Sequence, residues 1–322
     1  MPLKLQKMKY VESLNKALLE LLQEDERVYL LGEDILDPYG GAFKVTKELS
    51  TAFPKRVLTT PISEAAIVGM AIGMAMRGLR PIVEIMFGDF LMLAADQIIN
   101  SACKFAWMYN GQVEVPLVIR APMGGYRGYG PTHSQTLETL FLNVPGLTIV
   151  APSILHNPGE TLKRIVTETT GPVLFIENKG LYAGELGVDS GWMVEDSDGV
   201  KTARLWSWKE LPYVRIIAYG GMASLAIEAS KELYLRDEIL AEVVAPEQIK
   251  PLPQFPRSES PVVIVEETQS EFGWGAEVGL RLKPRLVSRV GAKSTPIPAS
   301  RNLEQQTLPQ VSDIVSAVKE LI

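Results

Sequence analysis

The stretch Thr59-Thr60-Pro61-Ile62-Ser63-Glu64-Ala65-Ala66-Ile67-Val68-Gly69 decides the fold and contains the most informative residue of this chain. It begins at the end of an expected strand and continues into an expected helix over Glu64–Met76. After Glu64 this helix carries no charge, and a helix that is apolar on every face is usually buried. Glu64 is therefore expected at the border of a hydrophobic core, next to the end of a strand.

Two interpretations of Glu64 are open at this point. In the structural one, Ser63 caps the helix and Glu64 complements the helix dipole, which contributes about 0.3–1 kcal/mol. In the functional one, a carboxylate at the edge of an apolar core is a catalytic or binding group. Gly69 and Gly73 are spaced so that another backbone could approach the helix closely. The segments that follow along the chain favour the functional interpretation.

The composition is that of an ordinary soluble globular protein with room for about two domains. Of the 322 residues, 46% are hydrophobic and 22% are charged, and the formal net charge is −6. No basic stripe stands out, so we expect no nucleic-acid partner. No apolar run approaches the roughly 18 residues that a membrane span needs, and residues 1–9 do not resemble a signal peptide.

Cysteine and histidine are scarce in this chain. The single cysteine, Cys103, cannot form an internal disulfide, which fits a reducing compartment. With only His133 and His156 in addition, a zinc site made by this chain alone is not expected. The sequence therefore predicts a cytoplasmic enzyme or enzyme subunit that has no metal site of its own.

Strand-like and helix-like segments alternate along the chain, which predicts α/β architecture with parallel sheets covered on both faces. Short apolar runs predict buried strands at Val28–Leu31, Val57–Thr59, Ile82–Met86, Leu117–Arg120, Thr148–Val150, Val173–Ile176, Val214–Tyr219, Ile239–Val244, Val262–Glu266 and Val287–Val290. Helical patterns lie at Val11–Glu24, Glu64–Met76, Leu91–Tyr109, Gln135–Leu142, Gly159–Thr169, Ala223–Leu235, Glu271–Leu282 and Val311–Leu321.

A change of composition divides this alternation into two doubly wound domains. We expect the first domain at residues 1–185 and the second at residues 213–322. The connection between them, residues 186–212, is rich in Gly, Asp, Ser and Trp and shows no clean period.

Three unusual segments of the first domain follow predicted strands. They are Thr60–Glu64, Met86–Phe90, and the glycine-rich run Ala121–Gln135, which contains His133. Ligands of parallel α/β sheets bind beyond the carboxyl ends of the strands, so we expect the three segments to meet at one edge. The glycine-rich run matches neither GxGxxG nor a Walker P-loop, so a dinucleotide or ATP site is not indicated.

Several motifs resemble the beta subunit of the thiamine-diphosphate-dependent 2-oxo acid dehydrogenases, of which the pyruvate and branched-chain enzymes are the best known. They occur in order along nearly the whole chain: Gly32-Glu33-Asp34, Thr60-Pro61-Ile62-Ser63-Glu64, Arg80–Glu84 with Phe87 and Asp89-Phe90, Asp96–Asn100, His133-Ser134-Gln135, Pro145-Gly146-Leu147 and Pro296–Glu304. The resemblance implies a transketolase-like pyrimidine-binding domain followed by a transketolase-type C-terminal domain.

The resemblance also implies roles for individual residues. Thiamine diphosphate reacts through its carbon C2, while the protein supplies orientation and electrostatics. Glu64 matches the glutamate that shares a proton with the aminopyrimidine ring, and burial of this residue is expected to raise its pKa. Phe90 matches the aromatic residue stacked on the pyrimidine, with Met86 and Ile62 as apolar neighbours. Plain core packing is the alternative role for these three side chains.

His133 matches the family histidine near the reacting carbon, which is thought to assist substrate binding and acyl transfer to a lipoyl group. Thr132 and Gln135 fit a capping box, which would place His133 in the first turn of a helix and favour its neutral form. The alternative is a histidine that only satisfies hydrogen bonds of its loop. His156 is expected to be structural or on the surface.

One family feature is missing from the chain. Such enzymes bind the diphosphate and Mg²⁺ through a Gly-Asp-Gly…Asn motif on a separate polypeptide, and this chain has no Gly-Asp-Gly. The resemblance therefore implies an alpha subunit that completes the site, with beta–beta contacts in an α2β2 heterotetramer and a lipoyl acyltransferase as a possible further partner. The segments Ala65–Met76 and Leu91–Tyr109 are expected at these contacts.

Departures from the family pattern leave the reaction open. The usual Asp-Leu-Arg-Thr of the second domain is replaced by Val244–Gln248, a common second histidine is Asn143, and the usual Leu-Tyr-Arg reads Leu181-Tyr182-Ala183. Two alternatives to the dehydrogenase therefore remain: a split transketolase-like carbon–carbon ligase and a non-catalytic scaffold subunit. An intact Glu64 argues against the scaffold. The sequence does not identify the 2-oxo acid.

Overall fold

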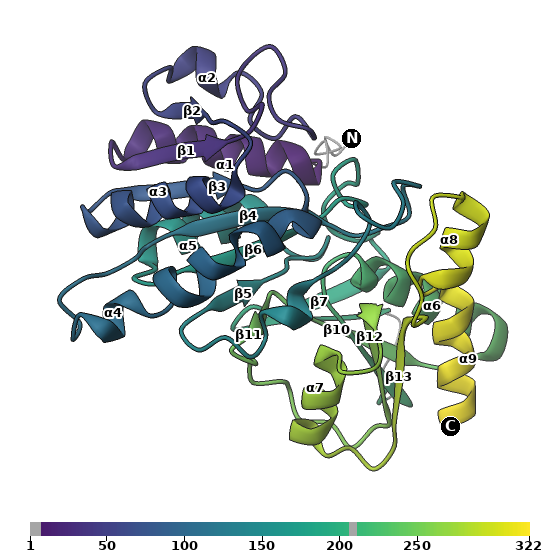
Figure 1. Cartoon of the computed structure of the whole chain (residues 1–322). Coiled ribbons are helices and arrows are strands. Elements are labelled where there is room, and N and C mark those ends of the chain that lie inside the picture. Colours follow the sequence, from purple (N-terminus) through teal and green to yellow (C-terminus); the bar gives the residue numbers. More distant parts are fainter. Residues whose placement is uncertain (1–7, 206–210) are drawn as a thin grey trace.

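Two mainly parallel sheets form the centre of the structure, a computed structural model that describes residues 8–205 and 211–322 (Figure 1). In the described part of the chain, the first sheet has seven strands in the order β11-β5-β6-β4-β3-β1-β2. Its strands are β1 (Val28–Gly32), β2 (Val57–Thr59), β3 (Arg80–Glu84), β4 (Val118–Met123), β5 (Thr148–Val150), β6 (Val173–Asn178) and β11 (Gln248–Lys250).

Successive residues of the first sheet point to opposite faces, and each face is covered. Leu30 points into a core that it shares with α1 (Tyr10–Glu24) and α5 (Pro158–Glu168). Leu31 points into the core on the other face, which is built on α3 (Glu64–Met76) and on the short helices η1 (Gly88–Ala94) and η2 (Gln97–Ala102). This two-sided cover confirms the predicted doubly wound fold.

The second sheet has six described strands in the order β13-β12-β9-β10-β8-β7. The four strands β9 (Val214–Ala218), β10 (Ala241–Pro246), β12 (Val262–Gln269) and β13 (Val287–Ala292) are parallel. Helices α6 (Met222–Asp237) and α9 (Val311–Leu321) pack on one face, and α9 and α8 (Arg301–Thr307) form the yellow end of the chain in Figure 1.

The two sheets share a core and exchange a strand. The core around α3 continues into the second half of the chain, where it includes Ile217 of β9 and Trp274 of α7 (Trp274–Leu282). Strand β11 belongs to the second half of the sequence but pairs antiparallel with β5 of the first sheet. The Trp274 indole nitrogen donates a hydrogen bond of 3.0 Å to the Ile249 carbonyl oxygen in that strand. The two halves are therefore packed as one unit.

The predicted connection at residues 186–212 contains an unpredicted hairpin. Strands β7 (Trp192–Ser197) and β8 (Val200–Leu205) pair with each other and extend the second sheet. Most of β7 is exposed at the sheet edge, so it lacks the continuous apolar run by which buried strands are identified. Residues 206–210 of the connection, which include Trp206 and Trp208, lie outside the described residues. The domain boundaries themselves stay predictions.

Two segments that were predicted as single α-helices have other conformations in the structure. The segment predicted as one helix over Leu91–Tyr109 consists of η1, η2 and the short α4 (Phe105–Met108), and η2 is a π-helix. Within the segment predicted over Gln135–Leu142, only η3 (Glu138–Leu140) is helical, and it is a 3₁₀ turn. Apolar spacing of three to four residues is compatible with all of these helix types, so the pattern alone does not separate them. The remaining short helix is α2 (Leu49–Ala52).

No helix within residues 8–205 and 211–322 is long and apolar enough to cross a membrane.

Candidate active site

The carboxyl ends of three neighbouring strands are aligned in the first sheet. Gly32 at the end of β1 is paired with Thr59 of β2 on one side and with Glu84 of β3 on the other. The residues that follow these three positions therefore leave the sheet at the same edge. This places Glu33, the turn that leads to Glu64, and the segment Met86–Phe90 together, as the topology predicts.

Glu64 is the first residue of α3 and is 6% exposed. Ser63 occupies the N-cap position, but its side chain makes no capping hydrogen bond, so the capping part of the structural interpretation is wrong. The helix is also not buried on every face, since Ala66 and Met70 are exposed. Ile62, which precedes the helix, is 85% exposed. A buried carboxylate and an exposed apolar side chain thus lie at one helix entrance.

A second carboxylate, Glu33, lies beside Glu64. Burial raises the pKa of Glu33, and the charges of Glu64 and Asp34 raise it further, while its interaction with the Ser63 backbone acts in the opposite direction. The Glu33 Oε1 atom and the neighbouring Thr60 hydroxyl are buried and have no hydrogen-bond partner among the described residues. Buried polar atoms are normally satisfied, so these atoms fit a polar ligand bound at this edge.

An aromatic cluster lies at the same edge of the sheet. The ring centroid of Phe87 is 4.7 Å from that of His133, 5.9 Å from that of Phe90 and 6.2 Å from that of Tyr129. Phe90 is also in contact with His133, at 5.3 Å. The structure therefore brings together Phe90 and His133, two residues that the sequence selected separately. Phe90 and Met86 are half-buried, so part of each surface is accessible to a ligand.

His133 lies in a turn and not in the first turn of a helix. The predicted capping box is wrong, because the side chains of Thr132 and Gln135 contact other groups and not the backbone at a helix start. The Gln135 side chain donates a hydrogen bond of 2.8 Å to Asp89, and the Thr132 hydroxyl lies 2.9 Å from Nδ1 of His133. Asp89 belongs to η1, so this hydrogen bond holds the loop of His133 against η1. No helix begins at Thr132.

Lys179 is a site residue that the sequence analysis missed. Its Nζ donates a hydrogen bond of 2.5 Å to the His133 carbonyl oxygen and lies 5.0 Å from the Phe87 ring centroid and 5.7 Å from that of Tyr129. Burial lowers the pKa of Lys179 to about 8, although Asp89 opposes this shift. Lys179 follows β6, so the rule that selected the other segments would also have found it.

The second half of the chain holds the glycine-rich loop in place. The Glu267 carboxylate accepts hydrogen bonds of 2.5 Å from the Gly125 backbone and of 2.7 Å from the Asn178 side chain. Burial raises the pKa of Glu267 to about 7. Glu304 accepts a hydrogen bond of 2.9 Å from the Gly128 backbone. The loop that carries His133 is therefore positioned by carboxylates of β12 and α8.

A buried ionic network lies within the strands of the first sheet. Arg120 of β4 makes two hydrogen bonds to Glu177 of β6, of 2.6 and 2.8 Å, and one of 2.6 Å to Glu84 of β3. The Tyr182 hydroxyl donates a hydrogen bond of 2.7 Å to Glu177. These side chains connect three adjacent strands close to the edge that carries the candidate site.

The described residues include no group of three or more His, Cys, Asp or Glu side chains that could hold a metal ion. His156 is buried, and its Nδ1 contacts the backbone and the hydroxyl of Ser153. Desolvation lowers the pKa of His156 to about 4. The expected surface position of His156 is therefore wrong, and its structural role stays a prediction.

Comparisons with known proteins give consistent results over nearly the whole chain. Residues 6–185 match the family described as transketolase, pyrimidine binding domain, and residues 209–314 match the transketolase C-terminal domain. The chain is 36% identical to the mitochondrial pyruvate dehydrogenase E1 component subunit beta-2 of Oryza sativa subsp. japonica, over 96% of this chain and 84% of that protein. It is 35% identical to the pyruvate dehydrogenase E1 component subunit beta of Rickettsia felis, over 96% of this chain and 97% of that protein.

The fold of this chain is also similar to that of a solved structure. The protein described as split gene transketolase, inactive beta4 tetramer, has 26% sequence identity and a TM-score of 0.70, with 98% of both chains covered.

Proposed function

Because the chain belongs to the transketolase-related family of pyruvate dehydrogenase E1 component beta subunits, we propose that its edge of buried carboxylates and aromatic rings is half of an active site. The chain is a component of a thiamine-diphosphate-dependent 2-oxo acid dehydrogenase and acts with an alpha subunit. The observation that carries the proposed site is the buried carboxylate of Glu64, which lies at the carboxyl edge of the sheet that also holds His133.

Glu64 is the residue proposed to exchange a proton with the aminopyrimidine ring. It is the first residue of α3, and Glu33 beside it is a second acid of the site. Phe90 is proposed to stack on the pyrimidine, with Met86 and the exposed Ile62 as apolar contacts. The unpartnered atoms near Glu33 support binding of a nitrogen-rich ring at this edge.

The diphosphate and Mg²⁺ are proposed to be held mainly by the alpha subunit. The sequence has no Gly-Asp-Gly, and the described residues include no acidic cluster that suits a metal ion. A charged diphosphate needs a cation partner and backbone donors to compensate for its desolvation. The chain by itself therefore provides the pyrimidine side of the cofactor site only.

An apolar surface supports assembly with other subunits. Met70 of α3, Met92 and Leu93 of η1, and Trp107 and Met108 of α4 are exposed. Helix α3 packs against η1 and η2, and α4 follows η2 in the chain, so the residues are on neighbouring elements. Large exposed apolar patches typically mark protein interfaces. The proposed assembly is an α2β2 heterotetramer, and a lipoyl acyltransferase is a further proposed partner.

Separation of the chain from its partner tests this proposal. We expect the full-length chain alone to show little binding of thiamine diphosphate with Mg²⁺ in calorimetry, because the diphosphate side is missing. The complex purified after co-expression with an alpha subunit is expected to bind the cofactor and to decarboxylate a 2-oxo acid in the presence of an artificial electron acceptor. Micromolar binding by the isolated chain would contradict the shared site, and a complex inactive on every 2-oxo acid would contradict the function.

His133 is proposed to act near the reacting carbon, because it contacts Phe90 in the cluster. The His133→Ala variant is expected to slow acyl transfer to a lipoyl acceptor by at least about 100-fold, and to slow decarboxylation less, since a positioned proton donor contributes to the transfer step. Rates with an artificial acceptor and with a lipoyl acceptor separate the two steps. The His156→Ala variant is the control and should affect both steps equally. Small, equal losses in His133→Ala would indicate a purely structural histidine.

The split transketolase-like ligase remains a second candidate, because the chain is also similar to a split gene transketolase. Such an enzyme would transfer an aldehyde unit to a sugar or aldehyde instead of a lipoyl group. Assays of the same complex with aldehyde acceptors and with lipoyl acceptors distinguish the two. The cytoplasmic location also stays a prediction, since the Oryza relative is named mitochondrial.

A further inference from the structure

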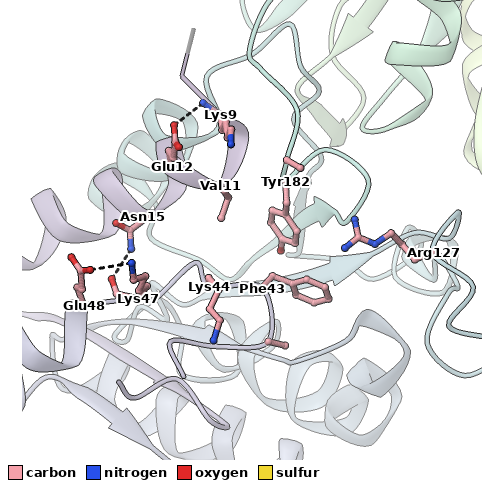
Figure 2. Close-up of a pocket in the computed structure, with 12 residues that line it drawn as sticks. Lys9, Val11, Glu12, Asn15, Phe43, Lys44, Lys47, Glu48, Arg127 and Tyr182 are labelled. Atoms are coloured by element: carbon pink, nitrogen blue, oxygen red, sulfur yellow. Dashed lines mark hydrogen bonds and ion pairs between the residues drawn. The ribbon is translucent and has the colours of Figure 1, made fainter. Parts of the chain in front are cut away.

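A cavity of about 580 Å³ opens next to the candidate site (Figure 2). One wall is formed by the start of α1, with Lys9 and Val11, and the opposite wall by the loop that contains Phe43 and Lys44. Figure 2 shows Arg127 on a third side, with its guanidinium group directed into the space between these walls. The volume is within the range of small-molecule binding sites.

The cavity has an excess of positive charge. Two carboxylates line it, and both are engaged: Glu12 accepts a hydrogen bond of 3.1 Å from the Lys9 backbone, and Glu48 lies 3.2 Å from the ammonium group of Lys47. The ammonium group of Lys44 donates a hydrogen bond to the Tyr39 carbonyl oxygen and lies 4.4 Å from the Tyr39 ring centroid, so it is engaged outside the cavity. The side chains of Lys9 and Arg127 have no carboxylate within ion-pair distance in the described part of the chain. Lys9 and Arg127 are therefore the two unpaired cations of this cavity, and together they favour binding of an anion.

The cavity and the His133 cluster share a wall of aromatic rings. The Phe43 ring, which lines the cavity, is 5.6 Å from the Phe87 ring, and Phe87 contacts His133. Arg127 is connected to the same cluster, because its guanidinium carbon is 5.9 Å from the centroid of the Tyr129 ring. Arg127 also repels Lys179, whose pKa it helps to lower. The positive charge of the cavity thus extends toward the reacting region.

We propose that this cavity binds a second acidic group on the substrate, so that the enzyme is selective for a 2-oxo acid whose side chain ends in a carboxylate or phosphate-type group. Arg127 is the specificity-determining residue, because its planar guanidinium group binds such groups through two parallel hydrogen bonds. Val11 and Phe43 provide apolar surface for the carbon chain between the two acidic ends. This inference rests on the proposed function and names its substrate class.

Two substrates of equal chain length test the inference in the complex with the alpha subunit. 2-Oxoglutarate carries the second carboxylate, and 2-oxopentanoate lacks it. The wild-type complex is expected to have the higher kcat/KM for 2-oxoglutarate. The Arg127→Gln variant is expected to lose about 10- to 100-fold in kcat/KM for 2-oxoglutarate, because a charge-assisted hydrogen bond is lost, and to change by less than about twofold for 2-oxopentanoate.

Control variants and a phosphonate substrate complete the experiment. Arg127→Lys keeps the charge and is expected to retain part of the selectivity. Arg301→Gln removes a cation that neighbours Arg127 in a separate cavity but does not line this one, and it should leave the substrate ratio unchanged. The isosteric 2-oxo-4-phosphonobutanoate, in the same assay, distinguishes a site for a carboxylate from one for a phosphate-type group. Equal losses on both five-carbon substrates in Arg127→Gln, or a wild-type preference for 2-oxopentanoate, would overturn the inference.

A binding measurement separates this inference from the proposed function. Calorimetry of the full-length chain with 2-oxoglutarate does not depend on decarboxylation, since the cavity is formed by this chain alone. Binding that is present in the wild type and lost in Arg127→Gln would support the anion site even if the complex decarboxylated no 2-oxo acid. Absence of binding to the isolated wild-type chain, together with an active complex that shows no preference for acidic substrates, would refute the anion site and leave the proposed function intact.

Discussion

The Glu64→Gln variant is expected to keep its fold and its partner but to lose at least about 100-fold in the rate of hydrogen–deuterium exchange at C2 of bound thiamine diphosphate. The amide has nearly the shape of the carboxylate but cannot accept or release the proton, and positioned proton transfer typically contributes 100- to 10,000-fold. The change removes one helix-dipole interaction, which costs at most about 1 kcal/mol of stability. Nuclear magnetic resonance of the cofactor after acid quenching measures the exchange.

Glu160→Gln is the matched control for this prediction. Glu160 is also an acid in the first turn of a helix, α5, but it is exposed and lies on another part of the first domain. The Glu160→Gln variant should show the wild-type rate of hydrogen–deuterium exchange at C2 of the cofactor. Its loss of stability should be as small as that of Glu64→Gln. Wild-type exchange in Glu64→Gln would remove Glu64 from the catalytic assignment and would favour a residue such as Glu33.

The Arg120→Met variant is expected to lower the free energy of unfolding by about 3–5 kcal/mol. Arg120 is 1% exposed and is hydrogen-bonded to Glu84 and Glu177, which are also buried. Methionine fills a similar volume, but it leaves two carboxylates without their partner in a region that excludes water, and an uncompensated buried charge has a cost of this size. Urea unfolding of the full-length chain, followed by circular dichroism, measures the difference.

Arg27→Met is the control for the buried network. Arg27 makes an ion pair with Asp25 whose nitrogen–oxygen distance is 2.8 Å, but its side chain is 58% exposed. Exposed pairs contribute about 0–1 kcal/mol, so this variant should remain close to the wild type. A loss below about 1 kcal/mol in Arg120→Met would show that the carboxylates are neutralised or hydrated without arginine. In that case, adding Glu84→Gln and Glu177→Gln to Arg120→Met should recover little of the stability that Arg120→Met loses.

The sequence by itself determined the elements with the strongest patterns. The bounds predicted for β2, β5, α3 and α9 are those of the structure. Continuous apolar runs and an uncharged helix have few alternatives in a folded chain, because burial of apolar surface dominates their placement. The same patterns, with the rule that ligands bind at the carboxyl ends of strands, selected the segments that carry Glu64, Phe90 and His133.

Only the tertiary structure decided how the polar side chains are paired. The capping box at Thr132 and Gln135 is locally reasonable, but Asp89 from another segment takes the Gln135 side chain. The strand-end rule covers the positions of Lys179, directly after β6, and of Arg127, within Ala121–Gln135, but it does not separate them from other loop cations, which are usually solvated. The importance of Lys179 and Arg127 follows from their proximity to the His133 cluster. Hydrogen bonds and charges act over a few ångströms, often between residues that are far apart in the chain. Local sequence patterns therefore determine the helices and strands, whereas long-range contacts determine the geometry of the site.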